Sequence, residues 1–282
     1  KFDLEGSGLF RTEFLFLDRA DAPSLEEQTE TYTKVLQAFG DRRVVVRTLD
    51  AGADKPLSFA DLGKEENPAL GRRGLRLCQA REDLIDTQLA ALAAAYEATK
   101  ADLWVMAPMV STLEEAQWFA DKARGVGLPK VGIMIEVPAA AIRADQMLSI
   151  VDFASIGTND LTQYTMAADR MDGELAPLLN AWQPAVLQMI KFACEGGRST
   201  GKSIGVCGEA GGDPLLALVL TGLGVGSLSM APTKVNAVRA ALRLHDLATC
   251  QQMAAYALDA PTAEEGRNNV LKLVSPTMLA LL

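Results

Sequence analysis

The sequence has little histidine, no long apolar run and no excess of basic residues, and each shortage excludes a class of function. Its only histidine is His245, so chemistry that needs a histidine nucleophile is not expected within this chain. No apolar stretch approaches the roughly 20 residues that cross a bilayer. The net charge of -9 argues against nonspecific binding to nucleic acid or to an anionic membrane surface, because both need a basic face. Any anionic ligand must therefore be held by a local cluster of cations.

Metal-binding cysteine spacing is also missing. The four cysteines are scattered without a CxxC pair, at Cys78, Cys194, Cys207 and Cys250. A chain of 282 residues can bury a core that needs no disulfides, so a reducing cytoplasm is the expected compartment. We expect Cys78 and Cys194 to be ordinary buried thiols. We expect His245, within the helical pattern VRAALRLHDLAT, to be a partly exposed helix residue.

Short β-branched runs alternate with longer segments of helical periodicity, which is typical of repeated βα units and a parallel sheet. The predicted strands are Ser7–Phe10, Val44–Thr48, Leu103–Ala107, Val131–Ile135, Phe153–Ile156, Ser203–Val206 and Val225–Ser229. The predicted helices are Leu25–Phe39, Glu82–Thr99, Thr112–Arg124, Pro138–Leu148, Pro184–Ser199, Pro214–Leu223 and Lys234–Leu244, followed by two more over Asp246–Leu258 and Ala263–Leu282. The pattern predicts an α/β protein.

A doubly wound sheet and a closed barrel both fit this alternation, and the repeat of similar βα units favours a (β/α)8 TIM-type barrel. Such a barrel has eight strands, whereas the pattern supplies one fewer. We therefore expect the first strand to lie upstream of the given sequence, and residues 1–282 to form one barrel domain. The last two predicted helices lie beyond the final strand and would pack under the barrel or against a partner.

Polar side chains fall at the ends of the predicted strands, where the active face of a βα barrel lies. The residues that follow a strand in this way are Arg11, Arg47, Glu136, Asn159, Asp160 and Cys207. Any one of them could be an ordinary strand end or helix cap. Because different strands deliver them to one rim, the set indicates a site.

The residue types at these positions suggest a bound metal and a bound polyanion. Glu136 and Asp160 are hard oxygen ligands, and two carboxylates without histidine favour Mg²⁺ or Mn²⁺ over zinc. Arginine provides a planar, permanently charged fork that matches phosphate and carboxylate oxygens. Four arginines could act in this way, namely Arg11, Arg47, Arg73 and Arg170. Two others, Arg72 and Arg76, are expected to be solvated surface residues.

Cys207 directly follows a predicted strand and begins the glycine-rich segment CGEAGG. A thiol outside a cationic environment is mostly protonated at neutral pH, so it can donate a proton as readily as it can act as a nucleophile. The glycines after it allow the backbone to approach a ligand closely or to adopt positive φ. A buried apolar cysteine is the alternative for this position.

Six segments, read in order, resemble a known family. They are GLFRTEFLFLDR, VVVRTLDAGADKP, NPALGRRGLR, GIMIEVPAAA, FASIGTNDLTQYTMAADR and GVCGEAGGDP. Together they resemble the C-terminal, phosphoenolpyruvate-binding domain of Enzyme I, the phosphoenolpyruvate-protein phosphotransferase that starts the bacterial sugar phosphotransferase system. Pyruvate phosphate dikinase and phosphoenolpyruvate synthase share several of these motifs, and GEAGGDP is also similar to the dikinase.

The resemblance implies a role for each candidate residue. Glu136 and Asp160 would bind Mg²⁺, and Cys207 would protonate the methylene carbon of enolpyruvate. Phosphoenolpyruvate would be held by Arg11, Arg47, Arg73, Asn159 and Arg170, with Lys55 adding a charge near the phosphate. In the family the phosphoryl group passes to a histidine on a separate N-terminal domain and then to the carrier protein HPr. The family also dimerises through this domain, so the resemblance implies a homodimer.

Other functions remain open at this stage. The chain could be the corresponding domain of pyruvate phosphate dikinase or phosphoenolpyruvate synthase. It could be a Mg²⁺-dependent oxoacid lyase, although a lyase needs fewer phosphate-binding arginines than this sequence offers. It could also be a non-catalytic module that senses phosphoenolpyruvate or supports dimerisation.

Overall fold

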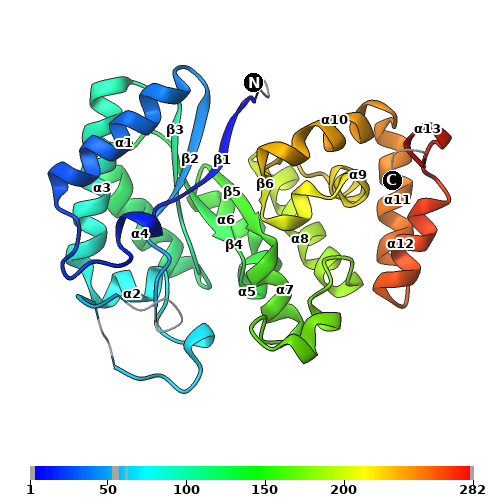
Figure 1. Ribbon diagram of the computed structural model, residues 1–282, viewed down its shortest axis with the longest axis horizontal. Coiled ribbons are helices and arrows are strands. Elements are labelled where there is room, and N and C mark those ends of the chain that lie inside the picture. Colours follow the sequence, from blue (N-terminus) through cyan, green and yellow to red (C-terminus); the bar gives the residue numbers. More distant parts are fainter. Residues whose placement is uncertain (1–3, 53–56, 61–62, 280–282) are drawn as a thin grey trace. The chain divides into compact units, whose positions relative to one another are not determined.

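The computed structural model describes residues 4–52, 57–60 and 63–279. The chain divides into two compact units. The N-terminal unit comprises residues 5–134 and 150–153, and the C-terminal unit comprises residues 135–149 and 154–282 together with the first four residues. Each unit carries its own part of the strand and helix repeat (Figure 1).

The N-terminal unit is built on four strands, β1 (Gly6–Arg11), β2 (Arg43–Arg47), β3 (Leu103–Ala107) and β4 (Val131–Ile135). Each pairs in parallel with the next in chain order. The register pairs Arg11 with Arg47 at the ends of β1 and β2. Two of the predicted site arginines therefore lie side by side at the ends of neighbouring strands.

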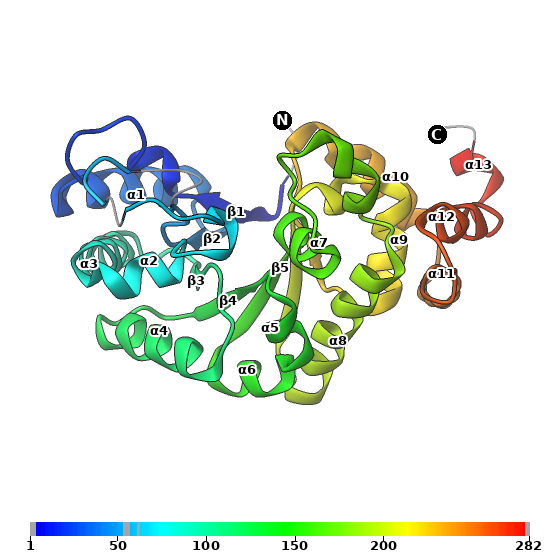
Figure 2. The same ribbon diagram turned by 90° about the horizontal axis from the view of Figure 1, so that it is seen from below.

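The helices of this unit are α1 (Leu25–Phe39), α2 (Leu75–Ala80), α3 (Glu82–Thr99) and α4 (Leu113–Gly125). Capping boxes begin α1 at Ser24 and α4 at Thr112, where the side chain satisfies an amide that the first turn cannot. α1 packs along α3 (Figure 2). Tyr32 and Leu36 of α1 are fully buried there, which fixes both helices beside the strands that carry the arginines.

The C-terminal unit contains β5 (Phe153–Gly157), β6 (Ser203–Cys207) and the short β7 (Ser227–Leu228), with β6 and β7 parallel. Its helices are α5 (Pro138–Ile142), α6 (Ala144–Ile150), α7 (Thr158–Met166), α8 (Pro184–Thr200), α9 (Pro214–Leu223), α10 (Val235–Arg243), α11 (Leu247–Leu258), α12 (Ala263–Leu271) and α13 (Pro276–Leu279). α9 is apolar on almost every face because α10 and α11 cover it. α11, α12 and α13 are the extra C-terminal helices.

The predicted fold class is confirmed. Seven strands occur in the described part of the chain, and they follow one another in chain order in the sheet, as in a TIM-type barrel. Most boundaries agree with the sequence patterns to within one or two residues.

Three local predictions are wrong. The helix predicted over Pro138–Leu148 is two helices, because the backbone leaves the helical region at Arg143. The last predicted helix stops at Leu271, and a short helix starts at Pro276, where proline is favoured because its missing N–H would have no helical partner at that position. His245 lies in the turn between α10 and α11, not in a helix.

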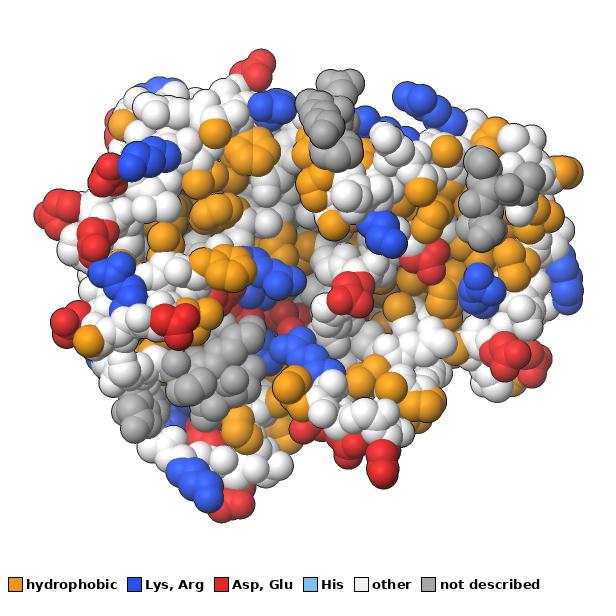
Figure 3. All heavy atoms as spheres, viewed as in Figure 1, with side chains coloured by type: hydrophobic (Ala, Val, Ile, Leu, Met, Phe, Trp, Pro, Cys, Tyr) orange, Lys and Arg blue, Asp and Glu red, His pale blue; other side chains and the backbone are white. Residues whose placement is uncertain are grey.

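Charged side chains of both signs are interspersed with apolar ones on the face shown in Figure 3. This distribution agrees with the acidic composition, and that face carries no extended basic patch. Among the residues that the structure describes, no helix is long and apolar enough to cross a membrane.

Candidate functional site

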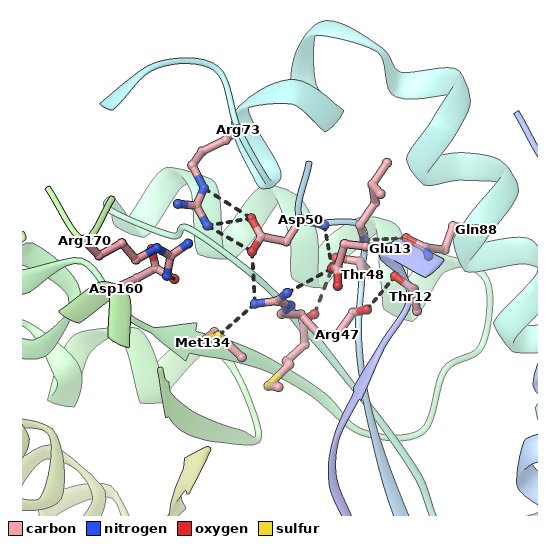
Figure 4. A network of polar contacts seen from close by, with 12 residues as sticks. Thr12, Glu13, Arg47, Thr48, Asp50, Arg73, Gln88, Met134, Asp160 and Arg170 are labelled. Atoms are coloured by element: carbon pink, nitrogen blue, oxygen red, sulfur yellow. Dashed lines mark hydrogen bonds and ion pairs between the residues drawn. The ribbon is translucent and has the colours of Figure 1, made fainter. Parts of the chain in front are cut away.

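Two of the predicted arginines form a buried ion cluster in the N-terminal unit (Figure 4). Arg47 donates to Glu13 Oε1 at 3.0 Å through Nη2 and lies 3.0 Å from Asp50 Oδ2 through Nη1. Arg73 Nη2 donates to both oxygens of Asp50, at 3.1 and 3.0 Å. Asp50 is therefore shared by both guanidinium groups. We call these four residues the arginine cluster, and their formal charges cancel.

Backbone contacts hold the arginine cluster in place. Arg47 is the last residue of β2, and its carbonyl accepts a hydrogen bond from Thr12 Oγ1 at 3.0 Å. Arg73 comes from a loop that approaches the segment after β2, where Gly74 N–H donates to Ala51 O. The approach depends on Gly52, since a Cβ there would lie 2.5 Å from the Cβ of Arg73.

The other basic residues of this unit differ in their surroundings. Arg11 is exposed at the end of β1. Lys55 lies outside the described residues. Arg72 is half exposed and pairs with Glu65, as expected for a surface residue. The same expectation is wrong for Arg76, which is partly buried and donates to Leu70 O and to Ser111 Oγ. Arg76 therefore connects α2 to the neighbouring loops through hydrogen bonds.

The remaining predicted site residues belong to the C-terminal unit. Glu136 follows β4 and is completely buried. Asn159 and the buried Asp160 lie in the first turn of α7, directly after β5. Arg170 Nη1 donates to Asp160 Oδ2 at 3.2 Å, and its backbone N–H donates to Gln163 Oε1. Asp160 therefore already has one cationic partner, which Figure 4 shows beside it.

Cys207 is the last residue of β6 and is 1% exposed. Its thiol donates to the carbonyl oxygen of Ile156 on β5 at 3.5 Å. The next residue, Gly208, has a φ of 116°, and a Cβ there would lie 2.7 Å from Thr158 Oγ1 and 3.6 Å from Asn159 Oδ1. The segment after Cys207 therefore lies directly against the first turn of α7.

Substitution of Gly208 by alanine should be costly for two reasons, a backbone conformation that is almost exclusive to glycine and a clash with Thr158. We expect Gly208→Ala to lower the free energy of unfolding by about 3 kcal/mol. Gly201→Ala is the matched control, because Gly201 also has positive φ but has nothing within 4 Å of the added Cβ. It should cost about 1 kcal/mol. Urea unfolding of both variants measures the difference, and equal midpoints would disprove the close approach.

The two buried carboxylates fit the donor set of a magnesium site. Mg²⁺ usually takes one or two carboxylates from the protein and keeps water or substrate oxygens as its other ligands. Glu136 and Asp160 are both within the C-terminal unit and are 0% and 7% exposed. Among residues 4–52, 57–60 and 63–279, no group of three or more histidine, cysteine or acidic residues that could hold a metal occurs. A magnesium site formed by Glu136 and Asp160 therefore stays a prediction, which the chemistry and burial of the two side chains support.

The predictions for Cys78 and Cys194 are confirmed, since both thiols are buried. Burial raises the pKa of each to about 12. Both thiols therefore stay protonated at neutral pH and have little nucleophilic character.

Sequence reasoning missed the acidic half of the arginine cluster. Glu13 and Asp50 are both buried and both bond Arg47. A local signal was present for Asp50, which follows Arg47 in RTLD; Glu13 follows Arg11 in RTE but pairs with Arg47, so its partner could not be read from proximity. An acidic residue so close to an arginine at a strand end is a candidate partner for it.

Comparison with known proteins places the chain in a family. The model of the PEP-binding domain of PEP-utilising enzymes matches residues 1–247. A phosphoenolpyruvate-protein phosphotransferase from Streptomyces coelicolor is 54% identical over 96% of this chain and 49% of its own length. One from Haloferax volcanii is 46% identical over 93% of this chain and 48% of its own length.

Among solved structures, a citrate lyase from Burkholderia xenovorans is similar over 90% of this chain and 83% of its own, with 16% identity and a TM-score of 0.44. That likeness is too distant to bear on function. The chain spans about half the length of the two phosphotransferases above. Their identity and the family match confirm the resemblance read from the six motifs. The chain therefore belongs to the PEP-utilising enzymes, as a PEP-binding domain.

Proposed function

We propose that this chain is the phosphoryl-donor domain of an Enzyme I type phosphotransferase, which binds phosphoenolpyruvate with Mg²⁺. The observation that carries the proposal is the buried arginine cluster, within a chain whose relatives are named phosphoenolpyruvate-protein phosphotransferase. Buried guanidinium groups in fixed orientations are suited to a ligand with both a phosphate and a carboxylate. An acidic protein has little other means of holding such an anion.

Each residue then has a distinct task. Arg11, Arg47, Arg73, Arg170 and Lys55 would neutralise and orient the phosphate and carboxylate, and Asn159 would donate an amide hydrogen bond. Glu136 and Asp160 would hold Mg²⁺, which neutralises charge on the substrate oxygens when bound. Positive groups around the moving phosphoryl oxygens lower the barrier to transfer, because they stabilise the charge that is spread over those oxygens.

Cys207 would supply the proton. Transfer of the phosphoryl group breaks the bond between phosphorus and the enol oxygen and leaves the enolate of pyruvate. The thiol proton of Cys207 then passes to the methylene carbon, which gives pyruvate and a thiolate that recovers a proton from water. The hydrogen bond from Sγ to Ile156 O is compatible with a protonated thiol in the resting state.

In the whole protein, the acceptor would be a histidine on a separate N-terminal domain, which passes the phosphoryl group to HPr for sugar uptake. The proposal includes a homodimer and a cytoplasmic location, as in the family that the motifs resemble. It treats residues 1–282 as one donor domain.

Isothermal titration of phosphoenolpyruvate into the purified chain tests the donor role. We expect binding that needs Mg²⁺ and is stronger than that of pyruvate. Glu136→Gln should weaken the Mg²⁺-dependent part of the affinity at least about tenfold, since it removes a charged ligand. Glu264→Gln, an exposed residue of α12, is the control and should bind normally. If the unmodified chain binds phosphoenolpyruvate equally well with and without Mg²⁺, the metal assignment is contradicted. If the folded chain does not bind phosphoenolpyruvate at all, the donor role is contradicted.

A further inference from the structure

Gln88 of α3 is completely buried and contacts the segment that joins two members of the arginine cluster. Its Oε1 accepts a hydrogen bond from the backbone N–H of Leu49 at 2.8 Å. Leu49 lies between Arg47 and Asp50 in the chain. A side chain from a distant helix therefore fixes the backbone between a site arginine and the carboxylate that orients it.

Other hydrogen bonds fix the orientation of the Gln88 amide. Its Nε2 donates to the hydroxyl of Tyr32 on α1 at 3.0 Å. That hydroxyl donates to Gln28 Oε1 at 3.0 Å, and Gln28 Nε2 donates to Pro23 O at 3.0 Å. Since a backbone N–H can only donate, Oε1 of Gln88 must face Leu49. The hydrogen bonds then run in one direction, from Gln88 to Tyr32, from Tyr32 to Gln28 and from Gln28 to Pro23.

The next backbone amide is held by a different side chain. Asp50 N–H donates to Glu13 Oε1 at 3.1 Å, and the same oxygen accepts from Arg47. Two successive amides after β2 are therefore anchored by two different side chains. Without either anchor, a buried N–H would lose its partner, which is unfavourable enough to rearrange the segment.

We propose that Gln88 is a positioning residue for the phosphoenolpyruvate site, and this inference rests on the proposed function. Through Leu49, Gln88 sets the direction of the Asp50 carboxylate, and Asp50 sets the orientation of the Arg47 and Arg73 guanidinium groups. Gln88 acts on the arginine cluster through the backbone amide of Leu49, which lies between Arg47 and Asp50 in the chain.

The experiment compares two equal substitutions, Gln88→Met and Gln28→Met, in the purified chain. Both glutamines are buried, at 0% and 1% exposure, and belong to the same hydrogen-bonded series. Both variants should lower the melting temperature. Only Gln88→Met should weaken phosphoenolpyruvate binding, by about tenfold, which corresponds to one lost hydrogen bond. Gln88→Glu, which keeps an acceptor for Leu49, should recover most of the affinity.

A second readout does not depend on substrate. The side-chain N–H resonances of Arg47 and Arg73 should be visible by ¹⁵N NMR, because both groups are buried and ion-paired. They should shift or broaden in Gln88→Met and keep their positions in Gln28→Met. If Gln88→Met does not fold, Tyr32→Phe takes its place in the experiment. This variant removes the hydroxyl that Gln88 Nε2 contacts and should shift the arginine resonances by a smaller amount.

The two proposals fail in different ways. If the unmodified chain does not bind phosphoenolpyruvate, the proposed function fails, while the arginine resonances still test the positioning role. If the chain binds but Gln88→Met, or Tyr32→Phe in its place, keeps both the affinity and the resonances, Gln88 has no positioning role. Equal losses of affinity in Gln88→Met and Gln28→Met would also overturn it, because they indicate general loosening of the core.

Discussion

Replacement of Cys207 by alanine should leave phosphoenolpyruvate binding nearly unchanged and lower pyruvate formation by the full-length enzyme about 100-fold or more. The size follows from the contribution that a positioned general acid makes to a proton transfer. Cys207 is the proton donor in the proposed function. It ends β6, and its Sγ lies 3.5 Å from the carbonyl oxygen of Ile156. The measurements are titration with phosphoenolpyruvate and steady-state assay of pyruvate release.

Cys194→Ala is the matched control, because that thiol is also buried and lies on the outer helix α8. It removes the same atom and should not change turnover. Undiminished pyruvate formation in Cys207→Ala would refute the role of Cys207 as proton donor. An equal loss in both variants would attribute the effect to packing.

Replacement of Asp50 by asparagine should lower the free energy of unfolding by about 3 to 5 kcal/mol. This is the usual cost of removing one partner from a buried ion pair, because the other charge remains buried without compensation. Asp50 is 1% exposed and serves both Arg47 and Arg73. Urea denaturation followed by circular dichroism measures the change.

Asp86→Asn makes the same chemical change at the surface. Asp86 is more than half exposed and lies 2.7 Å from Lys122 Nζ, and exposed pairs of this kind contribute about 1 kcal/mol or less. A similar small effect for Asp50→Asn would mean that water reaches the arginine cluster and that the guanidinium groups are not held by Asp50.

Much of the fold could be predicted because strands and helices follow local rules. The apolar run VGIMI specified β4 to the residue, and the capping residue Thr112 marked the beginning of α4. The break at Arg143 could not be read in this way, since nothing in its local sequence interrupts the helical pattern. Tertiary context can override helix propensity, and a local pattern does not report it.

The candidate site was predictable only in part. Residue types at strand ends indicated Arg11, Arg47, the two carboxylates and Cys207. Their partners were not visible, because Gln88 and Leu49 are 39 residues apart and meet only when α3 packs beside β2. Long-range contacts of this kind depend on the folded arrangement, and no local pattern in the sequence predicts which buried polar groups will meet.

In the proposed function, the carboxylates of Glu13 and Asp50 would also affect how tightly a substrate binds. Both already pair with the site arginines, so the oxygens of an incoming anion would share the guanidinium groups with acceptors that belong to the protein itself. The affinity would be moderated as a result, because part of the positive charge is already neutralised before the substrate arrives. After the reaction the guanidinium groups would remain paired with these carboxylates, which would favour departure of the product and leave the domain ready for another cycle.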